Sequence, residues 1–196
     1  MVVCDREEIP VEYIVRDMLS QAEHDPDAGA ILVTTSPKQA EVVAKRLKKL
    51  TPTLPRREII EASFSNRSAI IVVHDLEEIF EAVNEIAPEH LEVLTEQPFE
   101  DLHRIRNAGA IFLGPNTPEP VGDYFAGPNH TLPTSGWAKF SSPLGVQDFI
   151  KTSSVISYSE DRLRRQGEQI IRFAEEEKLF SHAEAIRIRL EKKIKF

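Results

Sequence analysis

The sequence predicts an α/β fold, with a parallel, doubly wound and incomplete Rossmann-like sheet followed by a C-terminal helical tail. Short continuous apolar runs, such as AILVTT (30–35) and AIIVVHD (69–75), alternate with segments of helical periodicity. Such strands are buried on both faces, which is typical of parallel sheets covered by helices. After this alternation ends, only helical periodicity continues. We therefore expect a partial Rossmann-like α/β domain over 1–158 and a helical extension over 159–196.

The elements of the α/β domain follow from apolar spacing and from Gly and Pro breaks. Ser36 followed by Pro37 is the clearest start signal, because it pairs an N-cap with a proline in the first helical turn. The expected order is a helix over 11–24, a strand over 30–35, a helix over 37–50, a strand over 69–75, a helix to Ile86, a strand over 91–95, a short helix over 100–106 and a strand over 108–113.

Two parts of this pattern are incomplete. The segment between Pro52 and Ser65 has no clear periodicity, and no strand is recognisable before the first helix. The chain therefore resembles one that enters its domain halfway, and we expect the sheet to have an unpaired edge at that point. Because an open edge favours pairing with another chain, we also expect an oligomer.

The segment from Gly114 to Thr134, GPNTPEPVGDYFAGPNHTLPT, contains three glycines and five prolines. Such a composition predicts neither a helix nor a central strand. A long irregular segment is usually functional or disordered, and the apolar Tyr124 and Phe125 favour the ordered alternative. We therefore expect an ordered loop that presents Asp123 and His130 beyond the end of a strand, where α/β proteins usually build their sites.

The C-terminal region has a different pattern. VISYS (155–159) predicts one more strand, and 160–195 predicts two helices with a break near Phe180. The basic residues between Arg187 and Lys195 alternate with Ile and Leu. This spacing is typical of an amphipathic helix rather than of a nucleic-acid-binding patch.

Composition narrows the class of protein. A net charge of −8 argues against binding to a nucleic-acid backbone, and 41% apolar residues suffice for a core. No apolar run approaches the roughly 20 residues of a membrane span, and the N-terminus does not resemble a signal peptide. The single Cys4 excludes an internal disulfide. We therefore expect a cytoplasmic protein with a small-molecule or protein partner.

Four candidate chemical residues lie at predicted element ends. Gln21 and His24, at spacing i and i+3, share one face near the end of the first helix. A histidine there is more often a partner of the helix dipole than a ligand. Glu89 and His90 follow Pro88 before a strand, where they form either an acid/base pair or part of a solvated loop.

The remaining candidates lie later in the chain. The position of Asp123 and His130 in the Gly/Pro-rich loop favours a functional role for them. The sequence around His182, near Glu177, does not by itself indicate such a role. Two histidines, one aspartate and one amide oxygen match the N and O ligands that zinc accepts, with a further histidine left for proton transfer. His74 and His103 have no such context and are expected to be surface or structural residues.

Four motifs resemble those of histidinol dehydrogenase. They are SQAEHDPDA (20–28), APEHLEV (87–93), AGAIFLGPNTPEPVGDYFAGPNHTLPT (108–134) and SHAEAIRIR (181–189). They occur in the order of that family and at nearly its spacing, and the third is long and specific. The resemblance covers nearly the whole chain, but it extends over only about the C-terminal half of the usual enzyme.

The resemblance implies a zinc-dependent, NAD-linked oxidation of L-histidinol to L-histidine through the aldehyde, within histidine biosynthesis. It also implies roles for individual residues. The zinc ligands would be Gln21, His24, Asp123 and His182; the acid/base pair would be Glu89 and His90; and the substrate contacts would be His90, Asp123, His130, Glu177 and His182. In the family the tail helices cross to a partner subunit, so a homodimer is implied in which Glu177 and His182 serve the neighbouring site.

Two departures from the family follow. The upstream half, with the inserted domain that holds most NAD contacts, has no counterpart here, and Lys178 stands where the family usually has glycine. One hypothesis is a truncated or split enzyme, for which a separate chain with the N-terminal half is a possible partner. The other is a catalytically silent dimeric fragment that binds zinc or an imidazole ligand. A related dehydrogenase for another hydroxyl substrate, and Mn²⁺ or Co²⁺ in place of zinc, also stay open.

Overall fold

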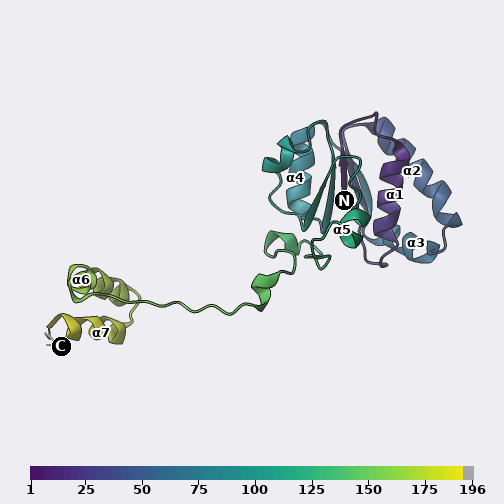
Figure 1. Ribbon diagram of the computed structural model, residues 1–196. Coiled ribbons are helices and arrows are strands. Elements are labelled where there is room, and N and C mark those ends of the chain that lie inside the picture. The colour runs from purple at the N-terminus through teal and green to yellow at the C-terminus, as the bar shows by residue number, and fades with distance from the viewer. Residues whose placement is uncertain (192–196) are drawn as a thin grey trace. The chain divides into compact units, whose positions relative to one another are not determined.

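The structure, a computed structural model, describes residues 1–191 and confirms the α/β class (Figure 1). Five parallel strands form one sheet in the order β3-β2-β1-β4-β5. The strands are β1 (Val2–Cys4), β2 (Ile31–Thr34), β3 (Ala69–Val72), β4 (His90–Leu94) and β5 (Ala110–Leu113). The helices are α1 (Val11–Ala22), α2 (Pro37–Leu50), α3 (Arg57–Asn66), α4 (Leu76–Ile86), α5 (Glu119–Tyr124), α6 (Glu160–Glu176) and α7 (Phe180–Glu191).

The first strand corrects the expectation of a chain that begins with a helix. Val2, Val3 and Cys4 form β1, which lies at the centre of the sheet and pairs in parallel with both β2 and β4. All three side chains are buried. Three residues are too few to show a pattern in the sequence. Because β1 is paired on both sides, the expected unpaired edge at this point does not exist. The expectation of an oligomer is therefore no longer supported by an open edge there.

Helices cover both faces of the sheet. One core packs α1, α2 and α3 against Val2, Cys4 and Leu32, and the other packs α4 against Val3 and Val33. Figure 1 shows α1, α2 and α3 on one side of the strands and α4 on the other. Because neighbouring residues of a strand point to opposite faces, the apolar runs seen in the sequence supply both cores.

Among the described helices, α2, α4 and α6 begin at a side-chain N-cap. The hydroxyl of Ser36 accepts a hydrogen bond from the Gln39 backbone N–H at 3.2 Å, as its N-cap pattern predicts. The segment without clear periodicity contains α3. The short helix expected near 100–106 is a 3₁₀ helix over Glu100–Arg104.

The Gly/Pro-rich segment contains a helix that its composition did not predict. Pro120 lies in the first turn of α5, where a missing N–H leaves no hydrogen bond broken. Gly122 faces the ring of Phe112 on β5, and a Cβ there would lie 2.6 Å from a ring carbon. The composition argument was wrong for this stretch, because a one-turn helix tolerates proline at its start and needs a small residue where it meets the sheet.

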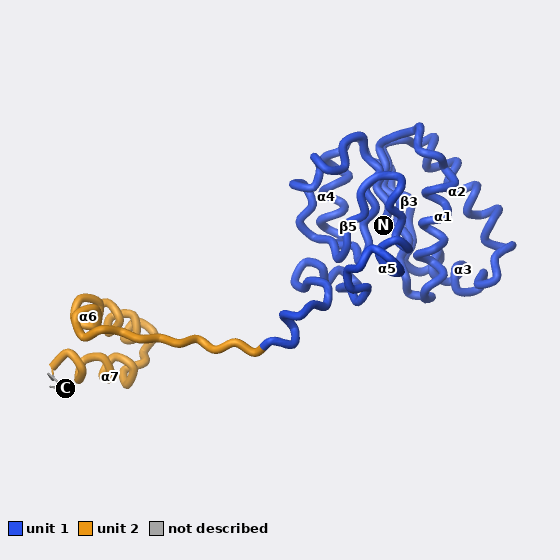
Figure 2. Tube along the Cα trace, in the orientation of Figure 1, with its two compact units in different colours: residues 1–150 blue, residues 151–196 orange. Residues whose placement is uncertain are grey.

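The chain divides into two compact units, residues 1–150 and a second unit that begins at Lys151 (Figure 2). The strand expected over 155–159 is absent, because Val155 and Ile156 are 94% and 83% exposed and pair with no other strand. Two helices follow, as predicted, and the expected end of the second at Lys195 lies outside the described residues. Within residues 1–191 no helix is both long and apolar enough to cross a membrane.

The two helices of the second unit form a hairpin with its own small core. Ile171, Ala174 and Ala183 are buried between them, and Leu190 covers Gly167 so closely that a Cβ there would lie 2.8 Å from it. Lys178, in the turn between the helices, has a φ of 61°. This is the left-handed conformation that favours glycine, so the departure at Lys178 strains the turn.

Lys178→Gly is therefore expected to stabilise the hairpin by about 1 kcal/mol, because glycine adopts positive φ without a Cβ clash. Amide hydrogen exchange of α6 and α7 measures this as slower exchange. Lys48→Gly, in the last turn of α2, is the control, and it should destabilise its own helix by up to about 1 kcal/mol. Equal or faster exchange of the hairpin in Lys178→Gly would contradict the strain.

Candidate functional site

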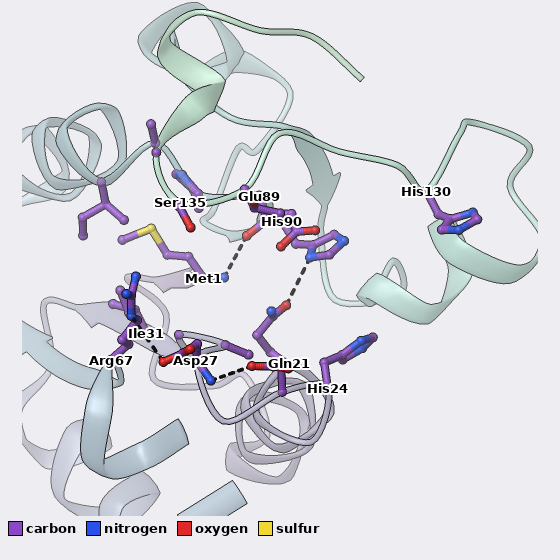
Figure 3. Close-up of a pocket in the computed structure, with 18 of the residues that line it drawn as sticks. Met1, Gln21, His24, Asp27, Ile31, Arg67, Glu89, His90, His130 and Ser135 are labelled. Carbon is purple, nitrogen blue, oxygen red and sulfur yellow. Dashed lines mark hydrogen bonds and ion pairs between the residues drawn. The ribbon is translucent and has the colours of Figure 1, made fainter. Parts of the chain in front are cut away.

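A cleft of about 620 Å³ lies at the amino ends of β1, β2 and β4. Its wall comes from the end of α1, the loops before β2 and β4, and the turn at 134–136 (Figure 3). The residues that line it include Met1, Gln21, His24, Asp27, Ile31, Arg67, Glu89, His90, Asp123, His130 and Ser135. We expected the site at the carboxyl ends of the strands. The cleft lies instead at the opposite edge of the sheet.

The topology explains this position. In a parallel sheet each connecting helix runs antiparallel to the strands, so the carboxyl ends of α1 and α4 meet the amino ends of the strands that follow. Gln21 lies in the last turn of α1, and His24 follows the helix, which ends at Ala22 rather than near His24. Both nevertheless line the cleft. Glu89 and His90 enter it from the junction between α4 and β4.

His90 is the central polar side chain of the cleft. It is the first residue of β4 and only 6% exposed. Its Nδ1 lies 3.1 Å from Oε1 of Gln21, and this amide oxygen can only accept, so Nδ1 carries the proton (Figure 3). Burial lowers the pKa of His90 to about 4. The imidazole is therefore neutral near pH 7, with Nε2 as a free base.

Glu89 is held at the rim by backbone contacts. Gly109 donates its N–H to Pro88 O at 2.9 Å, and Ala110 donates to Glu89 O at 2.8 Å. A Cβ on Gly109 would lie 2.5 Å from Glu89 O, so only glycine allows this approach. Burial raises the pKa of the half-buried Glu89 carboxyl. A carboxyl with a raised pKa is suited to proton transfer.

Helix α5 brings two carboxyl groups to His90. Asp123 Oδ1 lies 3.9 Å from His90 Nε2, and Glu119 lies one turn earlier on the same helix. Ser20 donates a hydrogen bond to Glu119 Oε2 at 3.3 Å, whereas Glu119 Oε1 and His90 Nε2 are buried without a partner. Potential metal-binding atoms of His90, Glu119 and Asp123 lie within 4.8 Å of one another.

Two glutamates behind the cleft have raised pKa values. Burial raises the pKa of Glu119 to about 7, and the nearby Asp123 adds to this effect. Burial, together with the charge of Asp17, raises the pKa of Glu92 to about 8. The sequence reasoning missed both glutamates. The i and i+4 spacing of Glu119 and Asp123 could have indicated a shared face, but only if the helix had been expected.

The structure places the other candidates less centrally. His130 is exposed and lies at the cleft apart from the His90, Gln21 and His24 group (Figure 3). Glu177 directly follows α6, and His182 is exposed in the first turn of α7, so both belong to the second unit. His74 and His103 do not line the cleft. Six of the eight proposed site residues therefore surround one cleft.

The fold and the cleft define an α/β protein of the Rossmann type, with a polar site of imidazole, amide and carboxyl groups. The family model for histidinol dehydrogenase matches residues 1–190. The chain belongs to the histidinol dehydrogenase family.

Relatives match nearly all of this chain. It is 56% identical over 191 residues to a histidinol dehydrogenase of Halalkalibacterium halodurans, covering 97% of this chain and 45% of the relative. It is 54% identical over 192 residues to that of Geobacillus kaustophilus, with 98% and 45% covered. The crystal structure of histidinol dehydrogenase from Elizabethkingia anophelis superposes with a TM-score of 0.81 at 34% identity, covering 97% of this chain and 43% of that one. The chain thus spans under half the length of these relatives.

The raised pKa of Glu92 predicts a pH-dependent effect of Glu92→Gln. Between its ordinary pKa of 4.5 and about 8, Glu92 keeps its proton when folded and loses it when unfolded. The free energy of unfolding of the natural chain therefore falls as pH rises through this window. The neutral amide escapes this loss, so the variant should gain stability over the natural chain by at most about 1.4 kcal/mol for each pH unit.

Urea denaturation at several pH values from 4.5 to 8 measures the difference between the two proteins. Glu61→Gln, which alters an exposed carboxyl on α3, is the matched control. A stability difference that stays constant, or that shrinks as pH rises, would show that Glu92 is ionised in the folded protein.

Proposed function

We propose that this chain forms the zinc and substrate site of a histidinol dehydrogenase, which oxidises L-histidinol to L-histidine through the aldehyde with NAD⁺ as oxidant. The observation that carries the proposal is the convergence of Gln21, His24, Glu89, His90 and Asp123 on one cleft. The chain spans under half of its relatives' length. The proposal assigns substrate binding and proton transfer to the residues of this chain.

The donor atoms in the cleft fit zinc. An amide oxygen from Gln21, an imidazole from His24 and a carboxylate from Asp123 line the same cavity, and zinc accepts this mixture of N and O ligands. Two of the three buried polar side-chain atoms without a partner in the described part of the chain, His90 Nε2 and Glu119 Oε1, lie beside Asp123, where a metal ion or a substrate group could contact them. A bound zinc ion would supply Lewis acidity and an anchor for the substrate's imidazole and amine nitrogens.

Proton transfer is assigned to His90 and Glu89. The free Nε2 of neutral His90 can accept the hydroxyl proton of the substrate as hydride leaves the carbinol carbon for NAD⁺. The Nδ1–H bond to Gln21 fixes the ring orientation during this transfer. Glu89 assists water in attacking the aldehyde, which gives the hydrate from which the second hydride leaves. His130 is assigned a contact with the substrate.

Glu177 and His182 complete the proposed site. Both are exposed in the α6–α7 unit, which is the arrangement needed for a contribution to another surface. We assign them to the cleft of a partner subunit in a homodimer, with His182 as the fourth zinc ligand and Glu177 at the substrate amine. A separate chain with the N-terminal half is the proposed source of NAD contacts.

A second candidate function is a catalytically silent dimeric module that binds zinc or an imidazole ligand. The group of His90, Glu119 and Asp123, whose potential ligand atoms could hold a metal ion without NAD, favours it. Titration of the metal-loaded chain with L-histidinol, with and without NAD⁺, separates the candidates when heat and NADH absorbance are followed together. NADH formation supports the enzyme, and binding without NADH supports a site that needs a partner or is silent. Absence of binding contradicts both.

Asp123→Asn is expected to weaken zinc binding by at least about tenfold, because the amide loses the negative charge that holds the metal. Calorimetric titration with Zn²⁺ measures the dissociation constant. Asp148→Asn is the matched control in the same unit, since Asp148 is exposed and accepts only from the Gly145 N–H. Equal zinc affinity of Asp123→Asn and the natural chain would remove Asp123 from the metal site.

A further inference from the structure

Glu92 lies behind the cleft on the same face of β4 as His90. Alternation along the strand sends Leu91 and Val93 into the core beneath α4, and Leu94 into the core beneath α1. His90 and Glu92 share the face of Leu94. Glu92 is 5% exposed and does not line the cleft, so it has no direct access to a substrate.

Glu92 contacts the side chain of Asp17 on α1 and the backbone of α5. Its Oε1 accepts a buried hydrogen bond from the Glu119 N–H at 3.0 Å, and Glu119 is the first residue of the helix. The N-cap residue, Pro118, provides no side-chain cap, and Pro120 has no N–H. The carboxyl of Glu92 therefore caps α5 from a neighbouring strand, in the way that an N-cap side chain normally does from within the chain.

Helix α5 depends on such contacts for its position. It has six residues, and a helix this short is not stable without tertiary packing. Gly122 lies against the ring of Phe112, which is the register partner of Glu92 on β5. The helix therefore lies across the β4–β5 pair and is held at its first turn by Glu92 and near its end by the Gly122 contact.

We propose that Glu92 is a positioning residue for Asp123, which it places opposite His90 by holding the first turn of α5. Asp123 follows Glu119 by four residues, one turn along the helix, and its Oδ1 lies 3.9 Å from His90 Nε2. Strand β4 thus positions both partners, because it contains His90 and because its Glu92 holds the helix that contains Asp123. The consequence for metal binding rests on the proposed function, in which Asp123 is a zinc ligand.

The role requires a side chain of the right length with an acceptor oxygen, and it does not require a charge. Glutamine keeps both the length and an acceptor oxygen. Aspartate keeps the carboxyl group but is one methylene shorter and cannot reach Glu119. Glu92→Gln and Glu92→Asp therefore separate a positioning role from a role of the ionisable group.

The test measures two quantities on the full chain, the dissociation constant of Zn²⁺ by calorimetry and the exchange rate of the Glu119 amide by NMR. Glu92→Gln should stay within about twofold of the natural chain in both. Glu92→Asp should weaken zinc binding by about tenfold, the range found for residues that orient metal ligands, and should accelerate exchange at Glu119. Thr95→Val, which removes a buried 2.7 Å hydrogen bond to Asp101 beyond β4, should change neither quantity.

The proposal is overturned if Glu92→Asp retains both natural values, or if Glu92→Gln loses as much as Glu92→Asp. If the natural chain binds no zinc, the metal part of the proposed function fails, and the exchange rate at Glu119 still decides whether Glu92 holds α5. Should Glu92→Asp not fold, Gly122→Ala shifts α5 by a clash with Phe112 and leaves Glu92 intact. That variant should weaken zinc binding similarly, and natural affinity in it would overturn the link between α5 and the metal.

Discussion

The burial of polar side chains along one face of β4 is the constraint on which the site depends. His90 and Glu92 occupy positions where a parallel strand normally places apolar residues, and both are almost fully buried. Buried polar groups are stable only when they are hydrogen-bonded. Gln21 from α1 accepts the hydrogen bond of His90 Nδ1, and the backbone of α5 donates to Glu92, whereas His90 Nε2 is left free toward Asp123. These two bonds connect α1 and α5, which carry Gln21 and Asp123, to one strand.

The position of the cleft follows from chain direction. The helices run antiparallel to the strands, so their carboxyl ends lie at the amino edge of the sheet. The junctions between helix ends and the next strands supply Gln21, His24, Glu89 and His90. Asp123 reaches the same edge from the other direction, because the chain turns back after β5 and α5 returns along the sheet. The usual rule for open α/β sheets would place the site at the opposite edge.

Much of this could be predicted from the sequence, and the failures have physical reasons. Continuous apolar runs identified four of the five strands, but Val2–Cys4 is too short to show a pattern, so the central strand was missed. Element-end residues were identified as candidates without knowledge of their convergence. Glu92 and Glu119 were missed because their importance arises from contacts between β4 and α5. Sequence spacing within one element cannot reveal a hydrogen bond between two.

The central claim is that Gln21, His24 and Asp123 hold a metal ion in this cleft and that L-histidinol binds there. Anomalous X-ray diffraction from crystals of the zinc-loaded chain, grown with L-histidinol, tests it most directly. The account predicts one zinc peak in the cleft, with Gln21, His24 and Asp123 within coordination distance and a substrate nitrogen on the metal. A zinc peak elsewhere, or a cleft with neither zinc nor histidinol, would contradict it.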